Sequence, residues 1–173
     1  MKSRFYLTVI IVAVTIFVTV RLYTPGALLL YKIREPYFAE PITSDTGTIL
    51  VRNDAYGNGE YGSKRRNGRT HGGIDILAPV GAPVYAAKSG IAFRGKVPTG
   101  YGKYIMIYHP DGYQTYYGHL SEWEALSTAH VRQGELIGYV GKTGNASPKA
   151  MRPHLHFEIR KEGKPQDPRV LMR

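Results

Sequence analysis

The chain divides into one long apolar run near its N-terminus and a series of short alternating segments after it. Phe5 to Val20 is a run of 16 residues without a charge, rich in Val, Ile, Leu and Phe. Residues 24 to about 46 contain three prolines and show no sustained periodicity. From Thr48 onward, short β-branched or aromatic segments are bounded by Gly, Pro and Asp. That pattern predicts strands separated by turns.

The apolar run is almost long enough to span a membrane by itself. A spanning helix needs about 20 apolar residues, with ~17 at the short end. Arg21 could extend its charged end toward the lipid headgroups, so that Leu22 and Tyr23 complete the span. We therefore expect residues 5–23 to form a transmembrane helix that acts as an uncleaved signal anchor.

Two other interpretations of this run fit the sequence less well. A cleaved secretory signal usually has a shorter apolar region, and the best cleavage candidate, Pro25-Gly26-Ala27, has Pro at a poor place. A core helix would show a polar face, which this run lacks. Basic residues flank the run on both sides, so the positive-inside rule does not orient it.

Eight candidate strands follow, and no helices alternate with them, which argues against a parallel βαβ sheet. We expect an all-β domain, an antiparallel β-sandwich or open barrel. His109 to Gly112 is a turn signal, so residues 104–117 are predicted to form a hairpin. Residues 122–130 are the only plausible helix in this part and could equally be a loop. The predicted strands are Thr48–Arg52, Ile74–Leu77, Val84–Ala87, Ile91–Val97, Tyr104–Tyr108, Gln114–Gly118, Leu136–Val140 and Leu155–Arg160.

Composition limits the possible chemistry and partners. The 173 residues suit one ordinary domain, and the absence of Cys excludes a disulfide scaffold, thiol catalysis, a Cys-ligated zinc and a lipid-modified N-terminal Cys. A net charge of +10 suits a polyanionic partner, whether nucleic acid, an anionic membrane or an acidic cell-wall polymer. The basic run Lys64 to Arg66 with Arg69 could contact nucleic acid, but such a run is more often a solvated loop. We therefore expect no nucleic-acid partner.

Four of the six histidines and one aspartate form a pattern that suits a metal. His71 and Asp75 lie four residues apart where a loop enters a predicted strand, and His154 and His156 begin the last strand. Residues i and i+2 of a strand point to one face, so these two imidazoles project together. Two His and one Asp suit zinc, and a catalytic zinc keeps three protein ligands and one open position. A further His nearby can act in proton transfer.

Together with the segments around it, this pattern closely resembles the LytM/lysostaphin-type zinc metallopeptidases (peptidase family M23). The resemblance covers roughly residues 48–171, nearly the whole predicted domain. Upstream, Arg52-Asn53-Asp54, Tyr61-Gly62-Ser63 and Arg66 resemble a subgroup of these proteins. The segments that carry the family resemblance are 69–79, 116–121, 131–138, 141–144 and 153–159, followed by Asp167-Pro168 and Leu171.

The resemblance implies one Zn²⁺ per chain, with His71, Asp75 and His156 as ligands. It implies His119 and His154 as the two catalytic histidines, flanking a water that zinc activates while polarising the scissile carbonyl. One of them would transfer the water proton and the other would hydrogen-bond to the oxyanion. Which histidine does which stays open, and we favour His154 as the base. The family's substrates are peptide bonds of peptidoglycan stems and cross-bridges.

Two departures from the family pattern concern the groove. The segment Asn145 to Pro153 is longer than the short Ser/Thr/Gly run usual there and places Arg152 before the Pro, so the substrate preference is open. No large N-terminal domain precedes the catalytic part, although a strand-like segment such as Tyr37–Ile42 could block the groove.

These observations predict a membrane-anchored zinc endopeptidase that hydrolyses peptide bonds of peptidoglycan stems or cross-links. We expect it to be single-pass in the plasma (inner) membrane through the N-terminal helix, with the catalytic domain on the periplasmic (extracytoplasmic) side. The oligomeric state is not specified. The alternatives are a non-catalytic wall-binding or regulatory protein on the same fold, and a lipoyl-like structural adaptor that would leave the His/Asp pattern unexplained. The expected parts are a cytoplasmic N-terminus (1–4), the anchor (5–23), a tether (24–46) and the metallopeptidase domain (47–173).

Overall fold

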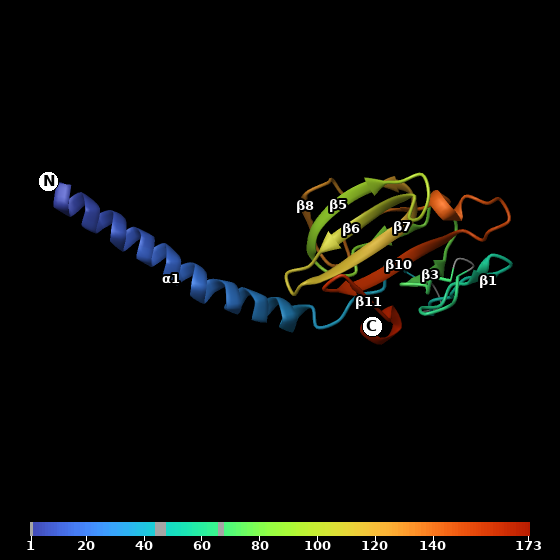
Figure 1. Ribbon diagram of the computed structural model, residues 1–173, viewed down its shortest axis with the longest axis horizontal. Coiled ribbons are helices and arrows are strands. Elements are labelled where there is room, and N and C mark those ends of the chain that lie inside the picture. Colours follow the sequence, from blue (N-terminus) through green and yellow to red (C-terminus); the bar gives the residue numbers. More distant parts are fainter. Residues whose placement is uncertain (1, 44–47, 66–67) are drawn as a thin grey trace. The chain divides into compact units, whose positions relative to one another are not determined.

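The computed structural model describes residues 2–43, 48–65 and 68–173 (Figure 1). It separates into two compact units, Met1–Pro36 and Tyr37–Arg173. Arg66, part of the upstream resemblance, and the expected boundary between tether and domain at residues 46–47 lie outside the described residues.

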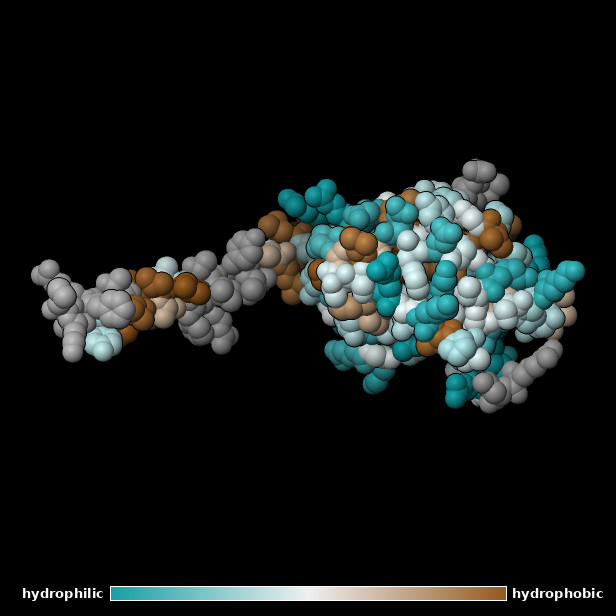
Figure 2. Space-filling model, turned by 90° about the horizontal axis from the view of Figure 1, so that it is seen from above, coloured by the Kyte–Doolittle hydropathy of each residue, from teal (hydrophilic) through white to brown (hydrophobic). Residues whose placement is uncertain are grey.

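The N-terminal unit is one helix, α1 (Lys2–Arg34), which continues through Pro25. It ends just before Pro36, as expected because proline disfavours the helical conformation of the preceding residue. Where its side chains are described, apolar residues lie on its surface (Figure 2). Val9 is 50% exposed, and Ile10 and Ile16 are each 59% exposed. Among the residues that the structure describes, no helix combines the length and hydropathy needed to cross a membrane. The expected span over residues 5–23 therefore stays a prediction, and α1 also covers residues 24–34 of the expected tether.

The second unit is built on a nine-stranded sheet in which every pairing is antiparallel, which confirms the predicted antiparallel β fold of this part of the chain. Along the main path the strand order is β11-β10-β7-β6-β5-β8, while β3 pairs with β10, and β9 pairs with both β7 and β4. A separate hairpin joins β1 and β2. The strands are β1 (Asn53–Asp54), β2 (Gly57–Asn58), β3 (Ile74–Leu77), β4 (Pro83–Tyr85), β5 (Gly90–Lys96), β6 (Lys103–Tyr108), β7 (Tyr113–Trp123), β8 (Ala129–Val131), β9 (Leu136–Val140), β10 (His154–Lys161) and β11 (Lys164–Gln166). Two short helical turns, η1 (Gly144–Ala146) and α2 (Pro168–Leu171), complete the unit.

The central strands separate a core face from an outer face. Ile105, Tyr117 and Phe157 are fully buried on the core face, because alternate side chains of a strand point to opposite sides. The intervening residues of β5, β6, β7 and β10 form the outer face, and the residues of the histidine pattern on β10 belong to it.

Two element predictions were wrong. The plausible helix over 122–130 is instead the end of β7, a turn, and β8, which is paired with β5. The predicted strand Thr48–Arg52 contributes only a single bridge, from Val51 to Ile76.

The segment Tyr37–Ile42, which we considered as a strand able to block the groove, instead contributes Phe38 and Ile42 to the core. Phe38 is 3% exposed and packs edge-on against His109 and Tyr113. Its backbone pairs with the C-terminus, because Phe38 N–H donates to Leu171 and Arg173 N–H donates to Phe38. His109, expected to be exposed in its turn, is buried and hydrogen-bonds to Ser89 O and Thr115 Oγ1.

Candidate metal centre and active site

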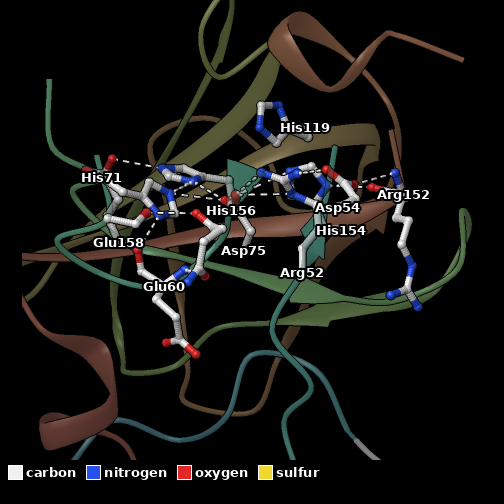
Figure 3. Close-up of polar contacts among 12 residues, drawn as sticks. Arg52, Asp54, Glu60, His71, Asp75, His119, Arg152, His154, His156 and Glu158 are labelled. Atoms are coloured by element: carbon white, nitrogen blue, oxygen red, sulfur yellow. Dashed lines mark hydrogen bonds and ion pairs between the residues drawn. The ribbon is translucent and has the colours of Figure 1, made fainter. Parts of the chain in front are cut away.

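The antiparallel pairing of β3 with β10 places the pattern's carboxylate beside its last histidine. Asp75 and His156 are Cα partners in this pairing, and His154 lies two residues earlier on the same face of β10 (Figure 3). The chain preceding β3 passes close to β10, since a Cβ built on Gly73 would lie 2.1 Å from Phe157 O. This close approach brings His71 to the other two residues.

The three predicted ligands present one atom each to a common point. His71 Nε2 lies 3.1 Å from Asp75 Oδ1 and 3.0 Å from His156 Nδ1, and His156 Nδ1 lies 2.8 Å from Asp75 Oδ1. A tetrahedral zinc with bonds of 2.0–2.1 Å separates its ligand atoms by about 3.3 Å. All three residues are buried, so the donor set and its spacing fit one zinc ion.

Outer hydrogen bonds orient both imidazoles toward this point. The carbonyl oxygen of Glu60 can only accept, so His71 Nδ1 donates to it at 2.9 Å, which leaves Nε2 as the nitrogen that faces Asp75 and His156. His156 Nε2 donates to Glu158 Oε1 at 2.9 Å. Such outer partners fix the tautomer and ring orientation of metal-binding histidines.

Electrostatics at the same point favour a positive charge. Burial raises the pKa of Asp75, but hydrogen bonds from His156 and His71 outweigh this effect and hold it well below its usual value. Burial lowers the pKa of His156, but its hydrogen bonds to Asp75 and Glu158 dominate and raise it to about 9. Burial also opposes ionisation of Glu158, yet contacts with His156 and Arg160 lower its pKa to about 2. Two ionised carboxylates therefore flank His156.

Two arginines neutralise the other oxygen of Asp75. Arg52, only 2% exposed, donates from Nη2 to Asp75 Oδ2 at 2.9 Å and from Nη1 to Asp54 Oδ1 at 2.5 Å. Arg65 Nη2 also donates to Oδ2, at 3.1 Å. Since Oδ2 is occupied by these contacts, Oδ1 is the carboxylate atom that faces the two imidazoles.

His119 and His154 lie beside the three candidate ligands. Their rings meet edge to face with centroids 5.0 Å apart, and His154 Nε2 lies 3.9 Å from Asp75 Oδ1. His119 Nδ1 donates to Thr143 O, and His154 Nδ1 donates to Arg152 O, so each neutral ring keeps an accepting Nε2. Burial is the main cause that lowers both pKa values, that of His119 to about 3. Both rings are therefore neutral at pH 7.

His119 has an unusual backbone. It has φ of +64°, a left-handed conformation that non-glycine residues rarely adopt. The pairing between β7 and β9 is irregular between Leu120 and Glu122, directly after it. Strained conformations of this kind persist where the surrounding structure imposes them, and they are concentrated at functional sites.

A pocket of about 520 Å³ unites these groups. All five predicted residues line it, namely His71, Asp75, His119, His154 and His156. Tyr56, Tyr101, Met151, Arg65 and Arg69 also line it. The structure thus brings every predicted site residue together, while the roles assigned to them stay predictions.

Two residues of this site had no role in the sequence-based prediction. Glu158 could have been found from strand alternation, because it lies two residues beyond His156 on β10 and so shares its face. Arg52 lay within a segment noted for its resemblance, but nothing in that segment indicated that its side chain would be buried against Asp75.

Comparisons with known proteins agree with this geometry. The family model for peptidase family M23 matches residues 69–168. The DD-carboxypeptidase/endopeptidase Mpg of Neisseria meningitidis is 46% identical over 101 residues, which are 58% of this chain and 22% of that protein. The peptidoglycan DD-endopeptidase ShyC of Vibrio cholerae is 35% identical over 103 residues, 60% of this chain and 23% of that protein. The chain thus spans less than a quarter of these two relatives.

A solved structure shares the fold as well. The crystal structure of a zinc-containing peptidase from Vibrio cholerae aligns with a TM-score of 0.61 and 29% identity, over 75% of this chain and 38% of that one.

Proposed function

The chain belongs to peptidase family M23, and from this premise we propose that it is a zinc endopeptidase that cleaves peptide bonds of peptidoglycan stems or cross-links. The names of the relatives support the substrate class, since ShyC is a peptidoglycan DD-endopeptidase and Mpg is a DD-carboxypeptidase/endopeptidase. The convergence of His71 Nε2, Asp75 Oδ1 and His156 Nδ1 beside two further neutral histidines is the observation that carries the proposal.

In this proposal His71, Asp75 and His156 hold the zinc. Zinc held there would supply a Lewis acid that lowers the pKa of a water and polarises the scissile carbonyl. Arg52 and Arg65 hold Asp75 Oδ2, and Glu158 holds the His156 ring, so the ligand atoms need little reorganisation.

His119 and His154 carry the proton chemistry. Each is neutral and presents Nε2 as an acceptor, because its Nδ1–H is engaged by a backbone carbonyl. We assign His154 as the base that removes a proton from the attacking water and returns it to the leaving amine. We assign His119, once it carries a proton on Nε2, as the donor to the oxyanion. Because Nδ1–H is held by Thr143 O, the ring must first take up a second proton from solvent, which the negative charge that develops on the oxyanion would favour.

The N-terminal helix is proposed to anchor the enzyme. Support comes from the uncharged run of Phe5–Val20 and from the fact that a single helix, α1, contains it. A wall hydrolase must act outside the cytoplasm, so the proposed topology places Tyr37–Arg173 on the periplasmic side of the inner membrane. Protease added to spheroplasts should digest this unit, and carbonate washing should leave the chain in the membrane fraction. Release by carbonate would contradict the anchor.

The activity is tested by digesting purified peptidoglycan with the full-length chain in detergent and identifying the products by mass spectrometry. Cleavage should require zinc and should be abolished by chelation. Stoichiometric zinc without cleavage would instead indicate a wall-binding or regulatory protein. Absence of both zinc and cleavage would overturn the proposal.

Variants separate the two groups of residues. His71→Ala and His156→Ala should lose zinc, measured by elemental analysis, together with activity. His119→Ala and His154→Ala should keep zinc while kcat falls about 10²–10⁴-fold. A shift of the acidic limb of the pH–rate profile in one of the two variants, measured on residual activity, would identify the base.

A further inference from the structure

The outer face of the sheet carries a group of aromatic side chains beyond the pocket. Across β10, β7, β6 and β5, the register aligns Glu158 with Tyr116, Met106 and Phe93, and the next row aligns Arg160 with Gln114, Tyr108 and Ile91. Tyr104 lies on the same face, opposite Gly95. We call Phe93, Tyr101, Tyr104, Met106, Tyr108 and Tyr116 the tyrosine face.

This face is partly open to solvent and nearly neutral. Tyr108 is 45% exposed and Ile91 37% exposed, and the Phe93 and Tyr108 rings meet edge to face with centroids 5.6 Å apart. In those two rows, among residues that the structure describes, the charged side chains are Glu158 and Arg160, which pair with each other. A neutral aromatic surface does not suit an acidic polymer or nucleic acid, which would require unpaired cations.

Tyr101 makes the tyrosine face continuous with the pocket. It lines the pocket, and its hydroxyl donates to Glu158 Oε1 at 2.8 Å. Its ring stacks on Tyr116, with centroids 5.7 Å apart and an interplanar angle of 23°, and it also contacts Tyr104 at 5.6 Å. A substrate bound in the pocket therefore reaches the tyrosine face without crossing another element.

We propose that the outer part of this face, Phe93 and Tyr108, binds sugar rings of the glycan strand that carries the cleaved stem peptide. This inference rests on the proposed function, since it takes the substrate to be a peptide joined to a glycan. Sugar rings present C–H groups on their flat faces, which pack against the negative faces of aromatic rings, and their hydroxyls suit the phenol of Tyr108 and the amide of Gln114.

Distances along the sheet agree with this occupant. Strands lie about 4.8 Å apart and residues about 3.3 Å apart along a strand, so Phe93 and Tyr108 both lie roughly 16 Å from His156. An extended stem of about four residues spans about 14 Å, and the lactyl arm that joins it to the sugar adds a few ångströms. A peptide cut in the pocket therefore places its sugar over these two residues.

The test compares one bond in two substrates. Full-length enzyme in detergent is given a cross-linked peptide dimer with its disaccharides and the same dimer without sugars. We expect the disaccharide form to have a kcat/KM about five- to tenfold higher, chiefly through KM, which is the range expected for one or two aromatic contacts.

Matched variants locate the effect. Tyr108→Thr removes the ring but places another residue of high β propensity in the strand. Tyr37→Thr removes a tyrosine of almost equal exposure, 44%, that lies outside the tyrosine face. Tyr108→Thr should reduce the sugar preference to about twofold or less while cleaving the sugar-free peptide as the wild type does. Tyr37→Thr should keep the preference. A preference that is absent in the wild type, or unchanged in Tyr108→Thr, would overturn the proposal.

A second measurement is independent of catalysis. Peptide-free glycan strands, prepared with an amidase, are titrated into the wild type and both variants by calorimetry. Binding that is weakened by Tyr108→Thr alone supports the proposal, and equal or absent binding in the wild type and Tyr108→Thr contradicts it. If the wild type cleaves neither peptide, the proposed function fails, and this titration still decides the glycan site.

Discussion

Arg52 is a buried cation whose partners are two carboxylates. Replacing it with Met leaves Asp75 without its main Oδ2 donor, because Arg52 supplies both Nη2 and Nε to that oxygen. Removing one partner of a buried ion pair costs about 3–5 kcal/mol. We therefore expect Arg52→Met to lower the free energy of unfolding of the chelated protein by about that amount, measured by urea denaturation.

If Arg52 only stabilised the fold, the zinc affinity of folded Arg52→Met protein would equal that of the wild type. Arg52→Met should weaken zinc binding in competition with a chelator, whereas Arg52→Lys should recover part of both losses. Arg132→Met, which removes an exposed arginine, is the control. Unchanged zinc affinity in Arg52→Met would show that Asp75 is positioned without it.

His119 links the site to the pH dependence of stability. Burial lowers its folded-state pKa to about 3 from 6.5, so between these values the unfolded chain binds a proton that the folded chain does not. The contribution of the neutral His119 ring to the free energy of unfolding is therefore fully present above pH 6.5. It is lost as the pH falls toward 3, by at most about 1.4 kcal/mol per pH unit.

Asparagine suits the same backbone conformation without a titratable ring, because it tolerates positive φ. Chelated wild type and His119→Asn should thus differ in stability by an amount that changes between pH 7.5 and 4.5, with the wild type losing more. If the free energies of unfolding of the two proteins changed by the same amount across that range, the lowered pKa of His119 would be contradicted.

The sequence-based prediction was most successful where the chemistry was local. His71, Asp75, His154 and His156 were found from spacing and strand alternation, and the structure brings them together. The same alternation reaches Glu158. Arg52 could not be placed in this way, because its contact with Asp75 joins positions 23 residues apart through tertiary packing.

Gly73 controls the pairing of two elements. A Cβ at this position would lie 2.1 Å from Phe157 O and 2.7 Å from Glu158 Cγ, so β3 could not approach β10 as it does. Gly73→Ala should destabilise the fold by about 3 kcal/mol, in the range of an overpacked core, and displace Asp75 from His156.

The measurement is the unfolding midpoint together with zinc content. Gly81→Ala provides a matched comparison, since Gly81 has φ of +88° but nothing within 4 Å of its Cβ, and backbone strain alone costs about 1–2 kcal/mol. Equal losses of stability in Gly73→Ala and Gly81→Ala would show that the close packing around Gly73 adds nothing to the cost of the substitution.

Strands with strong local patterns were also predicted well. The bounds of β3 and β9 match the predicted ranges, and the hairpin of β6 and β7 is present. Residues 122–130 were predicted wrongly. Strand β7 continues to Trp123 beyond an irregularity in its pairing with β9, and β8 is stabilised by its pairing with β5. Neither feature is encoded by local propensity, since both depend on a partner strand elsewhere in the chain.

At the scale of the whole molecule, the N- and C-terminal segments of the second unit, Tyr37–Arg173, pair with each other. Phe38 forms a parallel bridge with Met172, and Ala39 N–H donates to Ala87 O. These contacts explain why His109 is buried although its sequence is that of an exposed turn: Phe38, which we had assigned to the tether, covers it. A contact between residues 71 positions apart cannot be deduced from a turn motif.

Phe38 should therefore contribute to stability although it lies near the start of the unit. Its ring is 3% exposed, contacts His109 and Tyr113, and lies 4.8 Å from Lys88 Nζ. Phe38→Ala should lower the free energy of unfolding by about 3 kcal/mol, the low end for a buried phenylalanine. Tyr37→Ala, at a residue that is 44% exposed, should change it by less than about 0.5 kcal/mol.

Because Phe38 does not line the pocket, zinc content and kcat of the folded Phe38→Ala protein should match the wild type. A Phe38→Ala protein as stable as Tyr37→Ala would show that this segment is not part of the folded unit, and the tether would then extend beyond it.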